Sequence, residues 1–301
     1  MSKCRMIELS TPHFDLAMTL SSGQVFHWEG AGQGFCGTIG DRAVYVEQQA
    51  DVLRAEVASA SRRCVKDHAQ DAHGTVSHYF ALDHPLDEVC ASFPPDPIMN
   101  AARKFCQGLR IIRQPKWECL ATFICSSMKQ VTHIRQISRA LRQRFGLKHE
   151  ICSQKVFAFP SADRLATTSE KDLLKCGLGY RARTLLATAK QVAAGEVNLG
   201  SWHNLADHDL REQLCQLPGV GAKVANCVML FAYERVKAFP IDVWIERVLR
   251  ARYFSRKRRV TRLHLVKFAA DYFGPYGGYA QQYLFHHARM TKMKSQGTNT
   301  F

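Results

Sequence analysis

The spacing of apolar residues changes at a proline-rich stretch, ASFPPDPIM, around residues 91–99. Before it, from Phe14 to about Phe80, short apolar runs such as GFCGTIG and RAVYVEQ are separated by glycine-containing turns, which predicts antiparallel strands. After it, segments such as THIRQISRALRQRF place apolar residues three and four positions apart, which predicts short amphipathic helices. We therefore expect an α+β protein, with an antiparallel sheet domain over residues 1–98 and a helical domain over residues 99–301.

Charge is distributed unevenly between these two parts. The chain carries a formal net charge of +15, yet residues 1–100 contain 7 Lys/Arg against 13 Asp/Glu, and the remaining residues contain 34 against 13. A strongly basic folded domain favours a polyanionic partner such as nucleic acid. Charge alone also leaves open a basic enzyme without such a partner.

The eleven cysteines are scattered, odd in number and without a C-x-x-C pair, which indicates reduced thiols rather than a disulfide framework. The opening MSKCRMIELS lacks the apolar segment of a signal peptide, and no stretch has the length of a membrane helix. We expect the protein to stay inside the cell that made it. Its place would be the nucleus of a eukaryote or the cytoplasm and nucleoid of a prokaryote. The histidines form no metal-binding pattern, so we predict neither metal nor cofactor.

The segment LPGVGAKVA, residues 217–225, predicts a tight turn between two helices. It follows the amphipathic stretch DHDLREQLCQL, and a second helix is expected to begin near Ala222. Pro218, Gly219 and Gly221 favour a turn in which glycine takes backbone conformations closed to other residues. The free N–H groups of such a helix-hairpin-helix, at about residues 207–234, can bind a DNA phosphate without reading a base.

Two residues near this hairpin indicate chemistry beyond DNA binding. Lys223 falls in the first turn of the second helix, where the helix dipole disfavours an ammonium and so favours a nucleophilic amine. Asp242 follows Pro240 at the expected start of a third helix, near whose N-terminus an anion is favoured. A lysine nucleophile with a carboxylate partner suits cleavage of a glycosidic bond, because the carboxylate stabilises positive charge that develops on the sugar.

Five segments in the same order resemble the eukaryotic-type 8-oxoguanine DNA glycosylase/lyase family of the helix-hairpin-helix superfamily. They are SSGQVFHW at 21–28, ECLATFICSS at 118–127, GLGYRAR at 177–183, LPGVGAKVA followed by PIDV, and GPYGGYAQQYLF at 274–285. The resemblance implies an N-terminal sheet domain like half of the TATA-binding protein, followed by a helical glycosylase domain. It also implies duplex DNA containing an oxidised purine as the partner, bound by a monomer that does not associate with membranes.

The resemblance further implies four residues that recognise the extruded base. The carbonyl of Gly23 accepts a hydrogen bond from the N7–H that distinguishes 8-oxoguanine from guanine. Gln281 contacts the Watson–Crick edge, and Phe285, one turn later on the same helical face, stacks on the base. Cys227 lies one turn after Lys223, where a thiolate and an ammonium can form a dipole against the base. For Phe285 and Cys227, burial in the core is the alternative.

A second group of residues is implied to contact the DNA around the gap. Tyr180 is expected to act as a wedge beside the target, and Arg181 to face the opposite base. The family usually has three asparagines after CSS and an arginine shortly afterwards, where this chain has Met128 first and His133 at the arginine position. Because these side chains offer fewer donors, we expect weak selection of the opposite base. Trp244 replaces a histidine that lies near phosphate in the family.

The implied mechanism is attack of Lys223 on C1′, release of the base, and a Schiff base that permits β-elimination. An endonuclease III-like enzyme is a rival, but it usually carries a four-cysteine iron–sulfur cluster, and this chain has no cysteine after Cys227. An alkylpurine glycosylase typically lacks the hairpin lysine. A DNA-binding module without chemistry is the remaining alternative.

Overall fold

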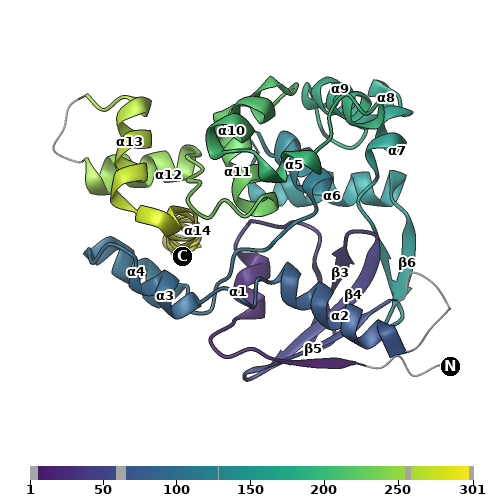
Figure 1. Ribbon diagram of the computed structural model, residues 1–301, viewed down its shortest axis with the longest axis horizontal. Helices are drawn as coiled ribbons and strands as arrows, with labels where there is room; N and C mark the ends of the chain where they lie inside the picture. The colour runs from purple at the N-terminus through teal and green to yellow at the C-terminus, as the bar shows by residue number, and fades with distance from the viewer. Residues whose placement is uncertain (1–5, 59–65, 128, 255–258, 298–301) are drawn as a thin grey trace.

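The computed structural model describes residues 6–58, 66–127, 129–254 and 259–297. Its N-terminal part is a five-stranded antiparallel sheet with strand order β1-β5-β4-β3-β2, which confirms the predicted architecture (Figure 1). The strands are β1 (Ile7–Ser10), β2 (Glu29–Ala31), β3 (Gly34–Ile39), β4 (Arg42–Gln49) and β5 (Val52–Val57). A short turn at Gly40 joins β3 to β4, as a glycine-containing break predicts, whereas the turn from β4 to β5 has Ala50 at positive φ instead of glycine.

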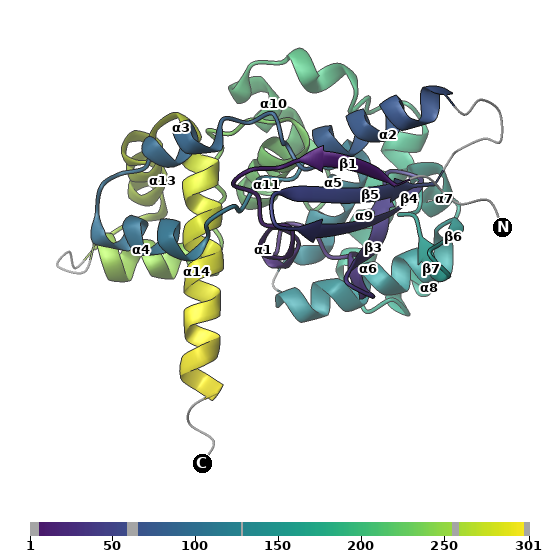
Figure 2. The ribbon, with the colours of Figure 1, turned by 90° about the horizontal axis from the view of Figure 1, so that it is seen from below.

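Two helices interrupt the region from Phe14 to Phe80 that the sequence predicted to be strands. Asp15 caps α1 (Leu16–Ser21) by accepting from the backbone N–H of Met18, and α2 (Lys66–Tyr79) packs against β1 and β5 (Figure 2). The α2 segment KDHAQDAHGTVSHY has few apolar residues, so its helical spacing is weak in the sequence. That part of the prediction was therefore wrong.

The helical part follows from α3 to α14 and encloses a large apolar core. Its main helices are α3 (Leu86–Ala91), α4 (Pro97–Phe105), α5 (Lys116–Ser126), α6 (Val131–Phe145), α7 (Ala162–Ala166), α8 (Glu170–Leu174), α9 (Arg181–Ala193), α10 (Asp207–Gln216), α11 (Ala222–Ala232), α12 (Val243–Val248), α13 (Arg262–Tyr272) and α14 (Gly277–Gly297). A hairpin of β6 (Lys148–Ile151) and β7 (Gln154–Phe157) lies between α6 and α7 and packs against β3 and β4. Among the described helices, none is both long and apolar enough to cross a membrane.

The two parts interleave near the expected boundary at residue 98. Leu86, Val89 and Phe93 belong to the core of the helical part, although they precede that boundary. Ile112 lies beyond it and belongs to the core of the sheet. Figures 1 and 2 both place α3 and α4 beside α14 at the C-terminal end of the chain. The exact boundary therefore stays a prediction.

A buried ion pair between α5 and α6 connects these two helices to the sheet. Arg142 on α6 pairs with Glu118 on α5 and donates hydrogen bonds to Thr38 Oγ1 on β3 and to the carbonyl of Phe157 on β7, both at 2.9 Å. Burial raises the pKa of Glu118, and the Arg142 charge opposes that rise. One guanidinium thus connects four elements, which fixes α5 relative to the sheet.

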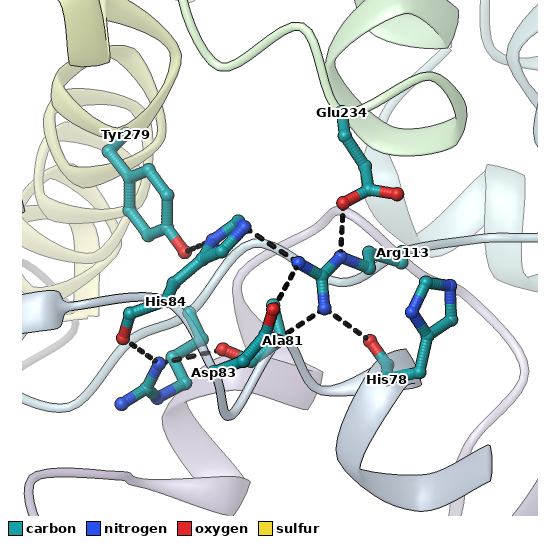
Figure 3. Close-up of polar contacts among 8 residues, drawn as sticks. His78, Ala81, Asp83, His84, Arg113, Glu234 and Tyr279 are labelled. Atoms are coloured by element: carbon teal, nitrogen blue, oxygen red, sulfur yellow. Dashed lines mark hydrogen bonds and ion pairs between the residues drawn. The ribbon is translucent and has the colours of Figure 1, made fainter. Parts of the chain in front are cut away.

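A second polar cluster, centred on Arg113, joins the segment before α3 to α11 and α14 (Figure 3). Arg113 binds Glu234 just after α11 at 2.5 Å, and it binds Asp83 through two nitrogens at 2.5 and 2.9 Å. His84 Nε2 lies 2.9 Å from Arg113, and its Nδ1 lies 2.7 Å from the hydroxyl of Tyr279 on α14. Arginine is only a donor, so Nε2 accepts and Nδ1 carries the proton. This cluster holds α11 and α14 in a fixed relation.

Candidate active site

The predicted helix-hairpin-helix consists of α10, a turn over residues 217–221, and α11. Leu217 and Val220 are buried and anchor the turn, while Gly219 and Gly221 are exposed. Gly219 has φ +81°, and an added Cβ would lie 2.9 Å from Thr184 Oγ1, so glycine is required there. Gly221 has φ −100°, and nothing lies within 4 Å of an added Cβ. The expectation that Gly221 needs glycine for its backbone conformation was therefore wrong.

Lys223 lies in the first turn of α11 and its side chain reaches α5. Its Nζ donates to Ser126 Oγ at 3.0 Å and lies 5.2 Å from the ring centroid of Phe123. The Ser126 hydroxyl itself donates to the carbonyl of Phe123 at 2.8 Å, so a lone pair is free to accept from the lysine. Ser126 and Phe123 were not singled out from the sequence, because Ser126 is 97 positions from Lys223 and no local spacing connects them.

Asp242 is the N-cap of α12, as predicted for a carboxylate at the start of a helix. Its Oδ1 accepts from the backbone N–H of Ile245 at 2.8 Å. Burial raises the pKa of Asp242, whereas the hydrogen bond from Ile245 and the charge of Lys223 act to lower it. A carboxylate that is partly desolvated and close enough to respond to a lysine charge is typical of a reactive site.

Cys227 lies one turn after Lys223 and is 4% exposed. Burial raises the pKa of its thiol to about 11, and the charges of Lys223 and Asp242 act on it in opposite directions. Lys223 and Asp242 thus lie close enough to Cys227 for their charges to act on its thiol. The expected thiolate is not the favoured form, however, because burial keeps the thiol neutral.

The other three residues implied in base recognition, Gly23, Gln281 and Phe285, lie on α14 and on the loop packed against it. Gly23 has φ +90°, and an added Cβ would lie 3.1 Å from Cε1 of Phe285, so these two residues pack together. Gln281 lies one turn before Phe285 on α14, is 5% exposed, and has an Oε1 atom without a hydrogen-bond partner. Gln282 Nε2 donates to the carbonyl of Ser22 at 3.1 Å and fastens α14 to the loop that carries Gly23.

Tyr180 and Arg181 differ sharply in exposure. Tyr180 is 68% exposed before α9, which suits a wedge residue. Arg181 is only 4% exposed, lies 4.4 Å from the Tyr180 ring, and donates to the carbonyls of Leu178 and Ser127. In the described structure Arg181 therefore does not point outward to an opposite base, because it is buried and both terminal nitrogens of its guanidinium bind the protein's own backbone.

The remaining predicted residues lie around the start of α6 and α12. His133 is exposed in the first turn of α6, and Trp244 is half-buried in the first turn of α12. Met128 lies outside the described residues. Among the described residues, the acidic and histidine side chains close enough to share a cation are His208, Asp209 and Glu212, all exposed on α10.

Comparison with known proteins finds matches to both halves of the chain. Residues 6–120 match the family model for the N-terminal domain of 8-oxoguanine DNA glycosylase, and residues 121–269 match that of the HhH-GPD superfamily base excision DNA repair proteins. The N-glycosylase/DNA lyase OGG1 of Arabidopsis thaliana is 28% identical over 93% of this chain and 78% of its own length.

Two solved structures are similar along nearly the whole chain. The structure of MBOgg1 in complex with a low affinity DNA ligand is 32% identical with a TM-score of 0.88, covering 97% of this chain and 98% of that one. The 8-oxoguanine glycosylase/lyase of Clostridium acetobutylicum, bound to double-stranded DNA containing cytosine opposite 8-oxoguanine, is 28% identical with a TM-score of 0.85. That match covers 96% of this chain and 98% of the other.

Proposed function

The chain belongs to the helix-hairpin-helix family of 8-oxoguanine DNA glycosylase/lyases, and from this premise we propose that Lys223 is its nucleophile and Asp242 the carboxylate partner. The protein is a DNA N-glycosylase with lyase activity that removes 8-oxoguanine in base excision repair. The observation that supports the two residues is their placement: Lys223 lies in the first turn of α11, and the partly buried Asp242 caps α12, near enough for the Lys223 charge to lower its pKa.

The chemistry follows from these two side chains. The free amine of Lys223 forms a bond to C1′ of the extruded nucleotide as the C1′–N9 bond breaks, and the base leaves with that electron pair and takes up a proton. The Asp242 carboxylate stabilises the positive charge that develops on the sugar. Opening of the sugar at O4′ converts the adduct into a Schiff base. Loss of a C2′ proton then expels the 3′ phosphate by β-elimination.

Substrate binding divides between the hairpin and the α14 side of the site. The exposed turn at Gly219 and Gly221 binds phosphate through backbone N–H groups, whatever the sequence. Tyr180 enters the gap that the extruded base leaves, and Gly23, Gln281 and Phe285 hold the base. The partner is double-stranded DNA that contains an oxidised purine, and the protein binds it inside the cell. A single copy of the chain binds the DNA, because one chain carries all of these residues.

Borohydride trapping tests this assignment, because only a Schiff base is reduced to a stable protein–DNA bond. We expect Lys223→Gln to abolish base release and trapping on duplex containing 8-oxoguanine while leaving its binding largely intact. Lys237→Gln, at an exposed lysine after α11, is the matched control and should behave as wild type. Trapping of the Lys223→Gln variant at the wild-type level would overturn the mechanism.

A further inference from the structure

Three side chains four residues apart on α14 form a row that the family resemblance covers only in part: Gln281, Phe285 and Arg289. At one end Gln281 presents a buried Oε1 without a hydrogen-bond partner, and at the other Arg289 presents a buried Nη1 without one. Buried polar atoms are almost always paired, and an unpaired one on the proposed base-binding helix is available to hydrogen-bond a ligand. The row therefore has an unpaired acceptor, an aromatic ring and an unpaired donor in that order.

Arg289 is held at its end of the row by contacts of its other atoms. Its Nη2 donates to the carbonyl of Ser21 at 2.5 Å and to His286 Nδ1 at 3.3 Å, and its guanidinium carbon lies 5.6 Å from the Phe285 ring centroid. Nη1 lies so close to Gly23 that an added Cβ there would be 2.6 Å away. The free N–H group is thus fixed beside Gly23 and Phe285.

The surroundings of Arg289 leave it charged at neutral pH. Burial lowers its pKa to about 10, and the charge of Arg135 acts in the same direction. His286 is neutral, because burial and the Arg289 charge lower its pKa to about 4, so its ring can accept from the guanidinium. A charged donor in a partly desolvated place makes a stronger hydrogen bond than a neutral one.

The order of the row fits a purine. Gln281 and Arg289 flank Phe285 along α14, and the Arg289 guanidinium carbon lies 5.6 Å from the Phe285 ring centroid. A purine carries its N1 edge and its C8 substituent at opposite ends, so one that stacks on Phe285 can face both polar side chains at once. A base stacked on Phe285 with its N1 edge toward Gln281 therefore places its C8 edge toward Arg289.

We propose that Arg289 is a specificity-determining residue whose Nη1 donates a hydrogen bond to the oxygen at C8 of the extruded 8-oxoguanine. This inference rests on the proposed function, which places the base in contact with Gly23, Gln281 and Phe285. Guanine carries hydrogen at C8 and offers no acceptor at that position. Arg289 thus reads the oxidised atom itself, on the edge opposite the one that faces Gln281.

Single-turnover excision from duplexes containing 8-oxoguanine or 8-thioguanine tests the inference, because 8-thioguanine keeps N7–H and replaces the oxygen with sulfur, a weak acceptor. We expect wild type to prefer 8-oxoguanine by about tenfold or more, the range for a hydrogen bond to a charged group. Arg289→Leu should lose most of that preference by slowing 8-oxoguanine excision, and Arg289→Lys should keep part of it. Arg54→Leu, which removes an exposed charge on β5, is the control and should match wild type.

Cleavage of a preformed abasic site separates this inference from the proposed function. It requires Lys223 but no base, so Arg289→Leu should cleave abasic sites at the wild-type rate and melt at a similar temperature. Three results for Arg289→Leu would each overturn the role of Arg289. They are excision of 8-oxoguanine at the wild-type rate, an unchanged preference for 8-oxoguanine over 8-thioguanine, and an equal loss of activity on both lesions and on abasic sites. Failure of wild type to cleave abasic sites would overturn the proposed function, and this inference with it.

Discussion

The Arg113 cluster and the Lys223–Asp242 site are both polar, but they differ in how their groups are paired. All three nitrogens of the Arg113 guanidinium have partners, and both ring nitrogens of His84 do as well. At the site, by contrast, Lys223 binds the hydroxyl of Ser126, and Gln281 on α14 keeps an unpaired oxygen. A cluster in which every polar group has a hydrogen-bond partner stabilises the fold, whereas a site with an unpaired group can still bind a substrate.

This contrast predicts that variants in the two regions will fail in different ways. Loss of a side chain from the fully paired cluster leaves its buried partners unpaired and lowers the free energy of unfolding. Loss of a side chain from the active site lowers catalysis or binding and leaves the fold largely unchanged.

Asp242→Asn should slow base excision by about a hundred- to a thousandfold, since an amide cannot stabilise positive charge on the sugar as a carboxylate does. The fold should persist, because asparagine is as good an N-cap as aspartate and can accept from Ile245. Single-turnover rates and thermal melting measure the two effects. Asp163→Asn, at an exposed acid in the first turn of α7, is the matched control.

The pH dependence of wild type sharpens this prediction. Burial raises the pKa of Asp242, so protonation of the carboxylate begins at a higher pH than for an ordinary aspartate. Excision should therefore decline as pH falls through that raised value, and the Asn variant should lack this decline. A wild-type rate that stays level down to the ordinary carboxyl range would contradict a role for the ionised form.

Arg113→Met should lower the free energy of unfolding by about 2 to 3 kcal/mol, because Glu234 and His84 lose a nearly buried partner. Arg54→Met, at an exposed pair with Glu8, should cost less than about 1 kcal/mol. Arg113 holds the pKa of Asp83 at about 2, so this part of the stabilisation is lost as pH falls from about 4 toward 2. Urea denaturation at several pH values measures both effects.

The sequence predicted those parts of the site that depend on local spacing. The hairpin turn, the place of Lys223 in the first turn of α11 and the capping position of Asp242 follow from residues within a few positions. The partners Ser126 and Arg289 could not be predicted in the same way, because each depends on elements that are distant in sequence. Helix α2 was missed because its buried face is narrow, Ala72, Val76 and Tyr79 at helical spacing, among mostly polar residues.

Gly221→Ala should weaken binding to damaged and undamaged duplex by about tenfold. The added methyl group hinders the close approach of the phosphate to the backbone N–H groups, and tenfold is the effect of losing one hydrogen bond to a charged phosphate. Its φ of −100° and the open space around an added Cβ mean that the protein itself tolerates alanine. Gly219→Ala should instead lower the melting temperature, since its positive φ and Thr184 both oppose a side chain. Binding isotherms at several salt concentrations distinguish the two, and loss of lesion preference alone in Gly221→Ala would mean that the hairpin is misassigned.

The smallest expected effect concerns the base opposite the lesion. His133 is exposed at the start of α6 and offers one donor when neutral, where the family's arginine offers five. Arg181, the other expected contact, uses its donors on Leu178 and Ser127, so little remains to read the opposite base. We therefore expect only a modest preference for cytosine over other partners of 8-oxoguanine.

His133→Arg should raise the preference for cytosine by about three- to tenfold, near the lower end of what a good contact to a base edge contributes. Gln136→Arg adds the same charge at an exposed position nearly one turn further along α6, and it should raise affinity for all duplexes without changing the preference. Single-turnover excision of 8-oxoguanine opposite C, T, G and A measures both. A wild-type preference for cytosine above about a hundredfold would mean that Arg181 leaves its backbone partners when DNA binds, because the exposed His133 has too few donors to select so strongly.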